Sequence, residues 1–171
     1  KTIEAWSVSE QPISANSSES IGFTLDEQIF VERGNVCTLM DELPIVSTTF
    51  DANVFWMGQK NLEKGRKFTI KLNTQEVECE VHEFKKAIDA STLETLTNQD
   101  YIGKNDVAEL TLKTRSPVAF DLFGSIATTG RFVLVDEYDV CGGGIITTYT
   151  PTTHADKLRD EVCTRDFNWI K

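Results

Sequence analysis

The sequence predicts an all-β fold, an antiparallel β-barrel or β-sandwich, over most of its length. Residues 68–72 and residues 108–113 alternate apolar and polar side chains with a period of two, which is typical of half-buried strands. Turn-forming residues separate roughly seven short segments of this kind, and this spacing is typical of barrels and sandwiches.

The segment from Pro117 to Ile146 supplies the central hairpin of the predicted fold. Residues 132–135 (FVLV) form a continuous apolar run between turn residues, which predicts a strand covered on both faces. Glycines 142–144 lead directly into the next apolar residues, and glycine within a strand predicts a bulge, a bend or a close backbone approach. A short acidic turn joins the two strands, and it consists of Glu137, Tyr138 and Asp139.

The first 46 residues are expected to form a separate, smaller module. Three short strands are predicted in it, at residues 3–6, 21–25 and 36–40. Residues 9–20 are polar and rich in turn formers, so they are predicted to be a loop. Pro44 ends the pattern because it restricts its predecessor and donates no hydrogen bond, and we place the boundary near residue 46.

Residues 47–149 are expected to form the second, longer β-rich module. Its predicted strands are residues 52–57, 68–72, 77–81 and 108–113 and the two strands of the central hairpin. Residues 62–65 and 73–74 are predicted turns. Residues 86–103 are predicted to be a long loop with room for one helical turn, since serine, threonine and asparagine weaken any helix there.

Residues 150–171 are predicted to be a linker followed by a short helix. Ala155, Leu158 and Val162 fall on one helical face, and Thr153 is a candidate N-cap. The sequence ends on apolar residues and begins without methionine, so we expect it to be a piece of a longer chain.

The composition argues against nucleic-acid and membrane partners. The 171 residues carry a formal net charge of −10, whereas phosphate binding requires clustered lysine and arginine. An acidic surface also repels anionic membranes, and no apolar run approaches the ~20 residues that span a bilayer.

The four cysteines are predicted to be structural and reduced. Cys37, Cys79, Cys141 and Cys163 are far apart and form no CxxC motif, and the two histidines, at positions 82 and 154, add no close metal-ligand spacing. Cys79 falls in an alternating strand, where a thiol behaves as a small apolar side chain. Together with the absence of a signal peptide at Lys1, this predicts a cytoplasmic protein.

Three groups of residues could carry chemistry, and each has a simpler structural interpretation. The carboxylates Asp136, Glu137 and Asp139 could act as an acid–base pair or a cation site, but carboxylates are also common in solvated hairpin turns. The ladder Glu76, Glu78, Glu80 and His82 could bind a cation, although lysines such as Lys71 could offset it as an ordinary surface. Glycines 142–144 run into a strand, and a phosphate loop would instead open a helix.

The structural interpretation is favoured for all three groups, so we predict no catalytic, cofactor-binding or metal-binding residues in this chain. The sequence also contains no GxxxxGK[ST], HExxH or GxSxG motif and no GxGxxG motif after a strand.

Several longer segments resemble one protein family in order and in detail. Residues 20–36 (SIGFTLDEQIFVERGNV) resemble the last strands of the second barrel domain of elongation-factor-Tu-like GTPases, and residues 50–81 and 106–146 resemble their third domain. Within that superfamily, ANVFWM, PVAFD and TGRFVLVDEYDVCGGGII are most similar to the large subunits of GTP-regulated sulfate adenylyltransferases.

This resemblance implies a Greek-key β-barrel, similar to domain III of elongation factor Tu, at residues 47–149. Residues 1–46 would then be part of a domain II barrel. It also implies a parent enzyme that uses GTP, ATP and Mg and couples GTP hydrolysis to the formation of adenylyl sulfate and pyrophosphate from ATP and sulfate. The implied partners are the GTPase domain of the same parent chain and a small catalytic subunit. Residues 162–171 (VCTRDFNWIK) resemble the approach to a fused adenylylsulfate kinase domain.

Three functional hypotheses follow from the residues and the resemblance. The first is a non-catalytic scaffold and subunit contact of the sulfate-activating GTPase. The second is an RNA-binding barrel of a translation-factor GTPase, against which the charge argues. The third is a free-standing enzyme that uses the Asp136 and Asp139 turn.

Overall fold

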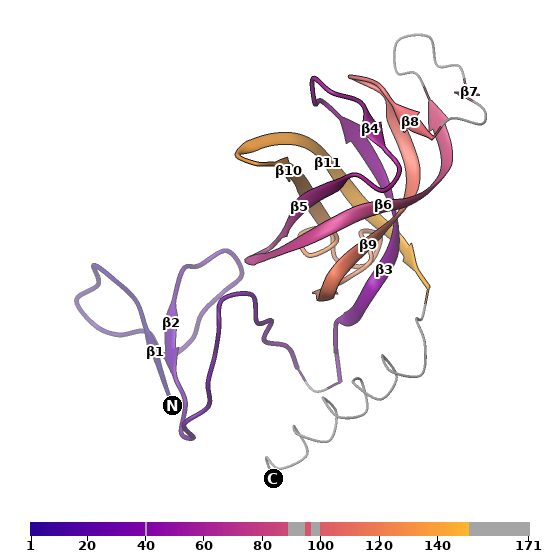
Figure 1. The fold of residues 1–171 in the computed structure, drawn as a ribbon. Helices are drawn as coiled ribbons and strands as arrows, with labels where there is room; N and C mark the ends of the chain where they lie inside the picture. Colours follow the sequence, from indigo (N-terminus) through magenta and orange to yellow (C-terminus); the bar gives the residue numbers. More distant parts are fainter. Residues whose placement is uncertain (40, 89–94, 97–99, 151–171) are drawn as a thin grey trace. The chain divides into compact units, whose positions relative to one another are not determined.

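The computed structural model describes residues 1–39, 41–88, 95–96 and 100–150, which divide into two units (Figure 1). The division falls between Glu32 and Arg33. The first unit holds two short antiparallel strands, β1 (Thr2–Glu4) and β2 (Gly22–Thr24), in which Ile3 lies opposite Phe23. The second unit holds all the other strands of the described residues.

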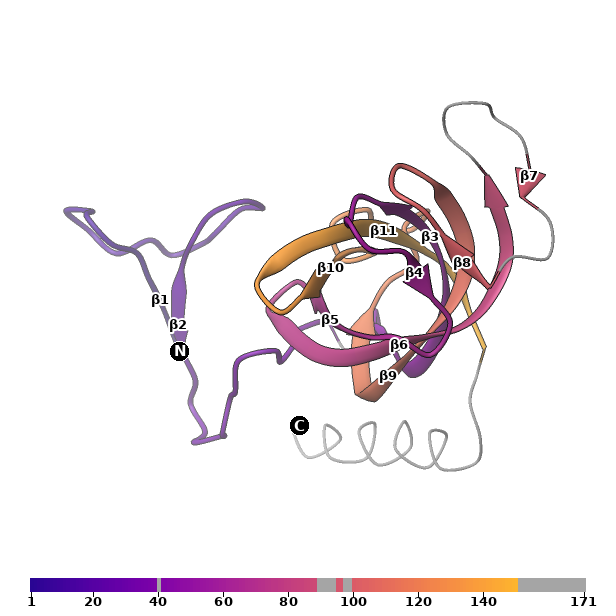
Figure 2. The same ribbon diagram turned by 45° about the horizontal axis from the view of Figure 1, so that its top comes forward.

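The second unit is a closed antiparallel barrel of six strands. They are β3 (Ile45–Trp56), β5 (Lys67–Leu72), β6 (Gln75–Ile88), β9 (Val107–Phe120), β10 (Arg131–Asp136) and β11 (Asp139–Tyr149). Neighbours follow the order β5-β10-β11-β3-β9-β6, and β6 also pairs with β5, which completes the ring visible in Figure 2. Closure leaves these six strands without a long unpaired edge.

Three short strands add to the barrel near one end (Figure 1). The strand β4 (Leu62–Glu63) pairs with β8 (Tyr101–Ile102), and β7 (Thr95–Leu96) pairs with the last residues of β6. Leu62 and Ile102 are cross-strand partners and are both fully buried. This pair therefore extends the hydrophobic core beyond the six main strands.

The barrel interior is filled by large apolar side chains from every main strand. Along β3, Phe50, Ala52, Val54 and Trp56 point inward at every second position, as the pleat of a strand requires. The rings of Trp56 and Phe68 meet edge to face with centroids 5.3 Å apart. The Trp56 indole N–H donates to the Lys60 carbonyl oxygen at 2.8 Å, so this buried polar group is satisfied.

The structure confirms the predicted all-β class, the antiparallel barrel at the second module, and most strands of that module. The predicted strands at 52–57, 68–72, 77–81 and 108–113 lie wholly or almost wholly within β3, β5, β6 and β9, and the central hairpin is β10 and β11. The turn at residues 73–74 is also confirmed, and Asn73 has a left-handed backbone with φ of 53°.

Several local predictions are wrong. Residues 36–39 form no strand, because no described strand lies alongside to complete a ladder, and the remaining residue of that prediction, Met40, lies outside the described residues. Residues 62–63 are strand instead of turn, since Ile102 and Tyr101 supply a partner. Residues 86–88, predicted as loop, continue β6, because β9 pairs with them as far as Val107.

Two predictions about exposure are also wrong. Val133 is 36% exposed, so the run at 132–135 is not covered on both faces: Phe132 and Leu134 point into the core and Val133 lies on the outer wall. Thr111, predicted as a wet-face residue, is only 7% exposed, because it lies opposite Asp51 and bonds to it. The predicted helix near residues 155–162 lies outside the described residues, as do 89–94 and 97–99 of the predicted loop.

Two of the three central glycines are required by close packing. A Cβ on Gly142 would lie 3.0 Å from the Phe55 carbonyl oxygen, and one on Gly144 would lie 2.6 Å from the Phe132 ring. The predicted close backbone approach is therefore confirmed at both positions. The bulge in this hairpin is at Cys141, which has no partner between the pairs Leu134–Gly142 and Val135–Val140.

Candidate functional site

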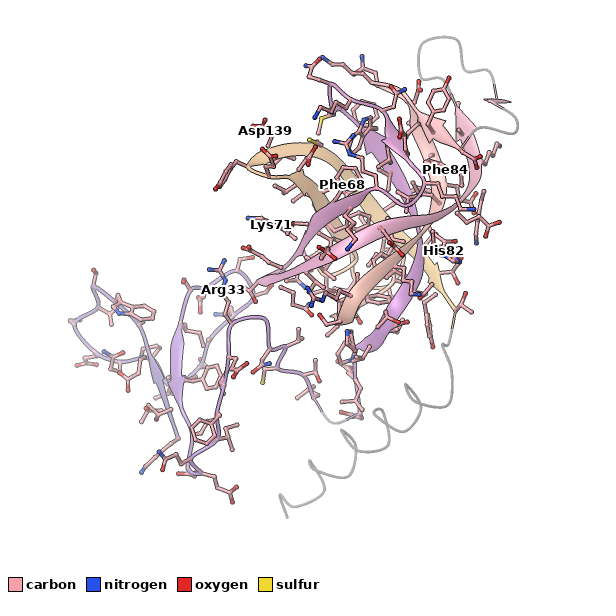
Figure 3. All side chains as sticks on the ribbon, viewed as in Figure 1. Arg33, Phe68, Lys71, His82, Phe84 and Asp139 are labelled. Atoms are coloured by element: carbon pink, nitrogen blue, oxygen red, sulfur yellow. The ribbon has the colours of Figure 1, made fainter. Side chains whose placement is uncertain are left out.

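Two carboxylates of the acidic hairpin between β10 and β11, Asp136 and Glu137, line a shallow hollow of about 150 Å³ together with Lys67 and Glu78, whereas Asp139 does not line it. The turn itself consists of Glu137 and Tyr138, and Asp139 begins β11 opposite Asp136. Asp136 forms an ion pair with Arg66, whose guanidinium also lies 4.9 Å from the centroid of the Phe68 ring. Figure 3 places Asp139 at the tip of this hairpin.

The acidic ladder on β6 is balanced by cations on the neighbouring strand. Glu76 lies 3.4 Å from the Lys71 ammonium, and Glu78 lies 2.9 Å from that of Lys67. The hydrogen bond from Lys67 lowers the pKa of Glu78 below its ordinary value. His82 lies on the outside of β6, away from Asp139 (Figure 3). These contacts are those of a solvated, charge-balanced wall.

The three described cysteines are free thiols in different surroundings. Cys79 is buried in β6, and desolvation, followed by the nearby Glu78 charge, raises its pKa to about 12. Cys141 is buried at the bulge, and its Sγ lies 3.4 Å from the Asp139 carbonyl oxygen. Cys37 is exposed. Cys163 lies outside the described residues.

An ion pair between a buried aspartate and an exposed lysine on the outer wall was not predicted from the sequence. Asp51 on β3 is only 5% exposed, and its Oδ1 accepts a hydrogen bond from Thr111 on β9 at 2.7 Å. Its Oδ2 lies 2.6 Å from the Lys85 ammonium of β6, and this hydrogen bond raises the pKa of Lys85. The sequence does contain a signal for this contact, because Asp51 and Thr111 are polar residues within the apolar strands β3 and β9. The signal can be used only when the register is known, since the register places the two residues opposite each other.

The cluster of Asp51, Thr111 and Lys85 connects the strands β3, β9 and β6, and each of its three polar side chains has a bonding partner. Both oxygens of the Asp51 carboxylate are engaged, as a buried charge requires. Lys85 is protonated below its raised pKa, so its charge persists through neutral pH, and the pair is lost as the pH rises through that value. We therefore interpret this cluster as a structural contact between strands.

An apolar groove, which we call the outer groove, lies on the outside of β3, β10 and β11. It has a volume of about 520 Å³. The residues that define it are Phe55, Val107, Phe123, Arg131, Gly143 and Ile145. Backbone bonds hold its rim, since Phe123 N–H donates to the Ile146 carbonyl oxygen at 2.9 Å and Ile146 N–H donates to Gly130 at 2.8 Å. No motif in the sequence pointed to this surface.

Two further observations concern ligands and membranes. Among the described residues, no three histidine, cysteine, aspartate or glutamate side chains come together as a metal site would need. Within the same residues, no helix has the length and apolar character to cross a membrane.

A comparison with protein-family models matches residues 49–147 to the family described as GTP-eEF1A C-terminal domain-like. This match lacks only the first residues of β3 and the last residues of β11, so it spans nearly the whole barrel.

Curated relatives are similar over a longer stretch. The "Sulfate adenylyltransferase subunit 1" of Francisella tularensis subsp. tularensis (strain WY96-3418) is 29% identical over 134 residues, which cover 77% of this chain and 28% of that protein. The "Bifunctional enzyme NodQ" of Rhizobium sp. (strain N33) is 28% identical over 134 residues, 77% of this chain and 21% of that protein. The chain thus spans less than a third of the length of these relatives.

Solved structures share the fold. Sup35 complexed with GDP superposes with a TM-score of 0.58 at 19% identity, over 63% of this chain and 26% of that one. Sup35 complexed with GMPPNP gives a TM-score of 0.59 at 19% identity, over 64% and 27%.

Proposed function

The chain belongs to the GTP-eEF1A C-terminal domain-like family, and from this premise we propose that it is a non-catalytic barrel region of a sulfate adenylyltransferase large subunit. In that role it acts as a scaffold and subunit contact. The observation that carries the proposal is the similarity to sulfate adenylyltransferase subunit 1 over 134 residues, which cover 77% of this chain.

The parent enzyme, in this proposal, couples GTP hydrolysis to the formation of adenylyl sulfate and pyrophosphate from ATP and sulfate. The GTPase domain and the small catalytic subunit are its partners, and GTP, ATP and Mg are used outside this chain. Residues 1–46 belong to a preceding barrel domain in this proposal, and residues 162–171 resemble the approach to the adenylylsulfate kinase domain that some members of the family carry. A cytoplasmic location agrees with these partners.

The side chains of the barrel support a structural role. Asp136 and the glutamates at 76 and 78 are held in ion pairs, and the Cys79 thiol is buried and protonated at neutral pH. Such groups stabilise a fold, whereas catalytic acids, bases and nucleophiles need access to a substrate.

The test uses the 171-residue chain, the full-length parent chain and the small subunit from the same genome. We expect calorimetry to detect no GTP binding by the 171-residue chain, and adenylyl sulfate to form only when the full-length parent and the small subunit are combined with GTP. Tight GTP binding by the 171-residue chain would refute the scaffold role. A full-length parent that leaves adenylyl sulfate formation unchanged would refute the enzyme assignment.

A second candidate function is an RNA-binding barrel of a translation-factor GTPase, which the family description and the Sup35 likeness favour. Against it stands the net charge of −10, since nucleic-acid affinity depends on phosphate contacts from cations. A gel shift with tRNA that weakens steeply with salt would support this candidate over the first.

A further inference from the structure

We propose that the outer groove binds a protein segment that presents an aromatic or branched apolar side chain and, about 7 Å away, a carboxylate. Three features of the outer groove support this inference. A side chain is missing at its centre, at Gly143; aromatic rings lie at its sides; and the cation Arg131 lies at its rim. The groove can take such a segment whichever parent enzyme carries the barrel, so its occupancy is separable from the proposed reaction.

The missing side chain is at Gly143. Along one row of the outer wall, Phe55, Gly143 and Val133 are cross-strand partners on β3, β11 and β10. Phe55 is 40% exposed and Val133 is 36% exposed, and between them Gly143 leaves a notch. Unlike at Gly142 and Gly144, packing does not demand glycine here, because a Cβ on Gly143 would have only the Phe132 carbonyl oxygen nearby, at 3.7 Å.

Aromatic side chains form the walls of this notch. Phe55 comes from β3, and Phe123, which is 37% exposed, comes from the turns between β9 and β10. A hollow bounded by half-exposed aromatic rings is the usual receptor for one buried apolar side chain of a partner. The adjacent turns are fixed to β11 by backbone bonds, so the pocket is formed before a partner arrives.

Arg131 supplies the positive charge at the rim. Its Nε donates to the Ala127 carbonyl oxygen at 2.8 Å, and none of the ion pairs of the described residues includes it. Arg131 lies opposite Ile145, two residues along β11 from Gly143, which is about 7 Å at roughly 3.4 Å per residue. In a partner, positions i and i+2 of a strand or i and i+4 of a helix have nearly this separation.

Two other occupants fit the wall less well. A two-fold contact between copies of this chain would place the rim cations near each other and would join two molecules of net charge −10. Addition of a strand to the sheet requires an unpaired edge, and β3, β10 and β11 are each paired on both sides within the closed barrel. We therefore favour binding of a partner segment through its side chains, which would enter the outer groove.

The test selects a phage-displayed library of random short peptides against the full 171-residue chain. We expect the enriched peptides to carry an aromatic, leucine or isoleucine residue with an aspartate or glutamate two to four positions away. A synthetic copy of the most enriched peptide should lose roughly tenfold or more in affinity toward Gly143→Leu, which fills the notch. Arg131→Glu should lose a similar factor and should enrich lysine and arginine when the selection is repeated.

The matched control is Tyr138→Ser, which changes a 97% exposed side chain at the hairpin tip and should leave peptide affinity unchanged. If Gly143→Leu does not unfold cooperatively on heating, it is not a usable variant. Peptide affinity is then compared between the wild type, the smaller substitution Gly143→Val and the charge reversal Arg131→Glu. The proposal is overturned by selection that enriches no acidic apolar peptide, or by affinity that neither position affects. Sedimentation that shows a dimer abolished by Gly143→Leu would overturn it in favour of a second copy.

Discussion

Asp51 illustrates how one buried charge can join three strands of the barrel. A carboxylate that is 5% exposed loses most of its hydration, and this cost is offset only when its oxygens gain strong partners. Thr111 and Lys85 supply those partners from β9 and β6. Because the Lys85 side chain keeps 37% of its surface exposed, solvent screens the pair and limits its contribution.

We expect Asp51→Asn to lower the free energy of unfolding by about 1–3 kcal/mol, because Lys85 loses its ion pair and Thr111 loses a charged acceptor. The matched control is Glu78→Gln, which removes an exposed ion pair of similar length, 2.9 Å, and should cost less than about 0.5 kcal/mol. Urea denaturation followed by circular dichroism measures both values. Equal losses for the two variants would contradict the special role given to Asp51.

Cys79 should make stability depend on pH at the alkaline end. Its pKa is about 12 in the folded barrel, mainly through burial, and about 8.5 in an unfolded chain. The neutral thiol is present in both states below the lower value, so its contribution is complete there. Above about pH 8.5 only the unfolded state loses the proton, and the contribution falls as pH rises toward 12.

We therefore expect the free energy of unfolding to decline less steeply between pH 8.5 and pH 10.5 in Cys79→Ala than in the wild type, whatever the difference at neutral pH. Alkylation with iodoacetamide and peptide mapping give an independent check. Cys37 should react rapidly in the folded chain, whereas Cys79 should react only on unfolding. Rapid modification of Cys79 in the folded chain would show that the thiol is accessible.

At the scale of elements, β11 shows how three consecutive glycines serve different purposes. Gly142 and Gly144 point into the crowded interior, where the Trp56 and Phe132 rings and the β3 backbone occupy the space of a side chain. A Cβ on Gly143 would point outward and would contact only the Phe132 carbonyl oxygen, at an ordinary distance of 3.7 Å. The alternation of the pleat therefore separates glycines needed for packing from one that packing does not need.

We expect Gly144→Ala to destabilise the barrel by about 1–3 kcal/mol, because its Cβ would lie 2.6 Å from the Phe132 ring and 2.8 Å from the Asn53 carbonyl oxygen. Gly143→Ala should be neutral or stabilising by up to about 1 kcal/mol, since it restricts the unfolded chain without a clash. Thermal and urea unfolding of the two variants measure the difference. A destabilising Gly143→Ala would show that the notch matters to the fold itself.

Elements with a clear period of two could be predicted from sequence, because alternation reports directly on a strand with one buried face. Residues 68–72 and 108–112 illustrate this, since all their apolar members are buried. The prediction failed where a pairing partner decides the outcome. Residues 62–63 become strand because Ile102 and Tyr101 lie alongside, and residues 36–39 have no such partner among the described strands.

The candidate site was less predictable than the fold, for the same physical reason. Asp51 and Thr111 are 60 positions apart, and the register of β3 on β9 alone brings them to 2.7 Å. The outer groove likewise combines residues from five segments, and its central feature is the lack of a side chain at Gly143. The acidic ladder was predictable because its cations follow from one short hairpin, β5–β6.

On the scale of the whole molecule, the closed barrel and the first unit differ in how they could be stabilised. The barrel buries a continuous core, whereas β1 and β2 hydrogen-bond as a sheet of two three-residue strands. A two-stranded sheet of this size is marginal in water. Several large apolar side chains of the first unit are exposed, among them Trp6 at 70%, Ile13 at 99% and Phe30 at 95%.

We expect removal of residues 1–32 to leave the free energy of unfolding of the barrel unchanged within about 0.5 kcal/mol, because every barrel strand keeps its partners. Urea denaturation followed by the fluorescence of Trp56, which is 1% exposed, measures this value. Removal of exposed apolar residues should also reduce aggregation. The matched control is removal of residues 1–50, which takes away half of β3, including the core residue Phe50, and should abolish cooperative unfolding. A loss of more than about 1 kcal/mol in the shorter truncation would mean that the first unit contributes to the stability of the barrel.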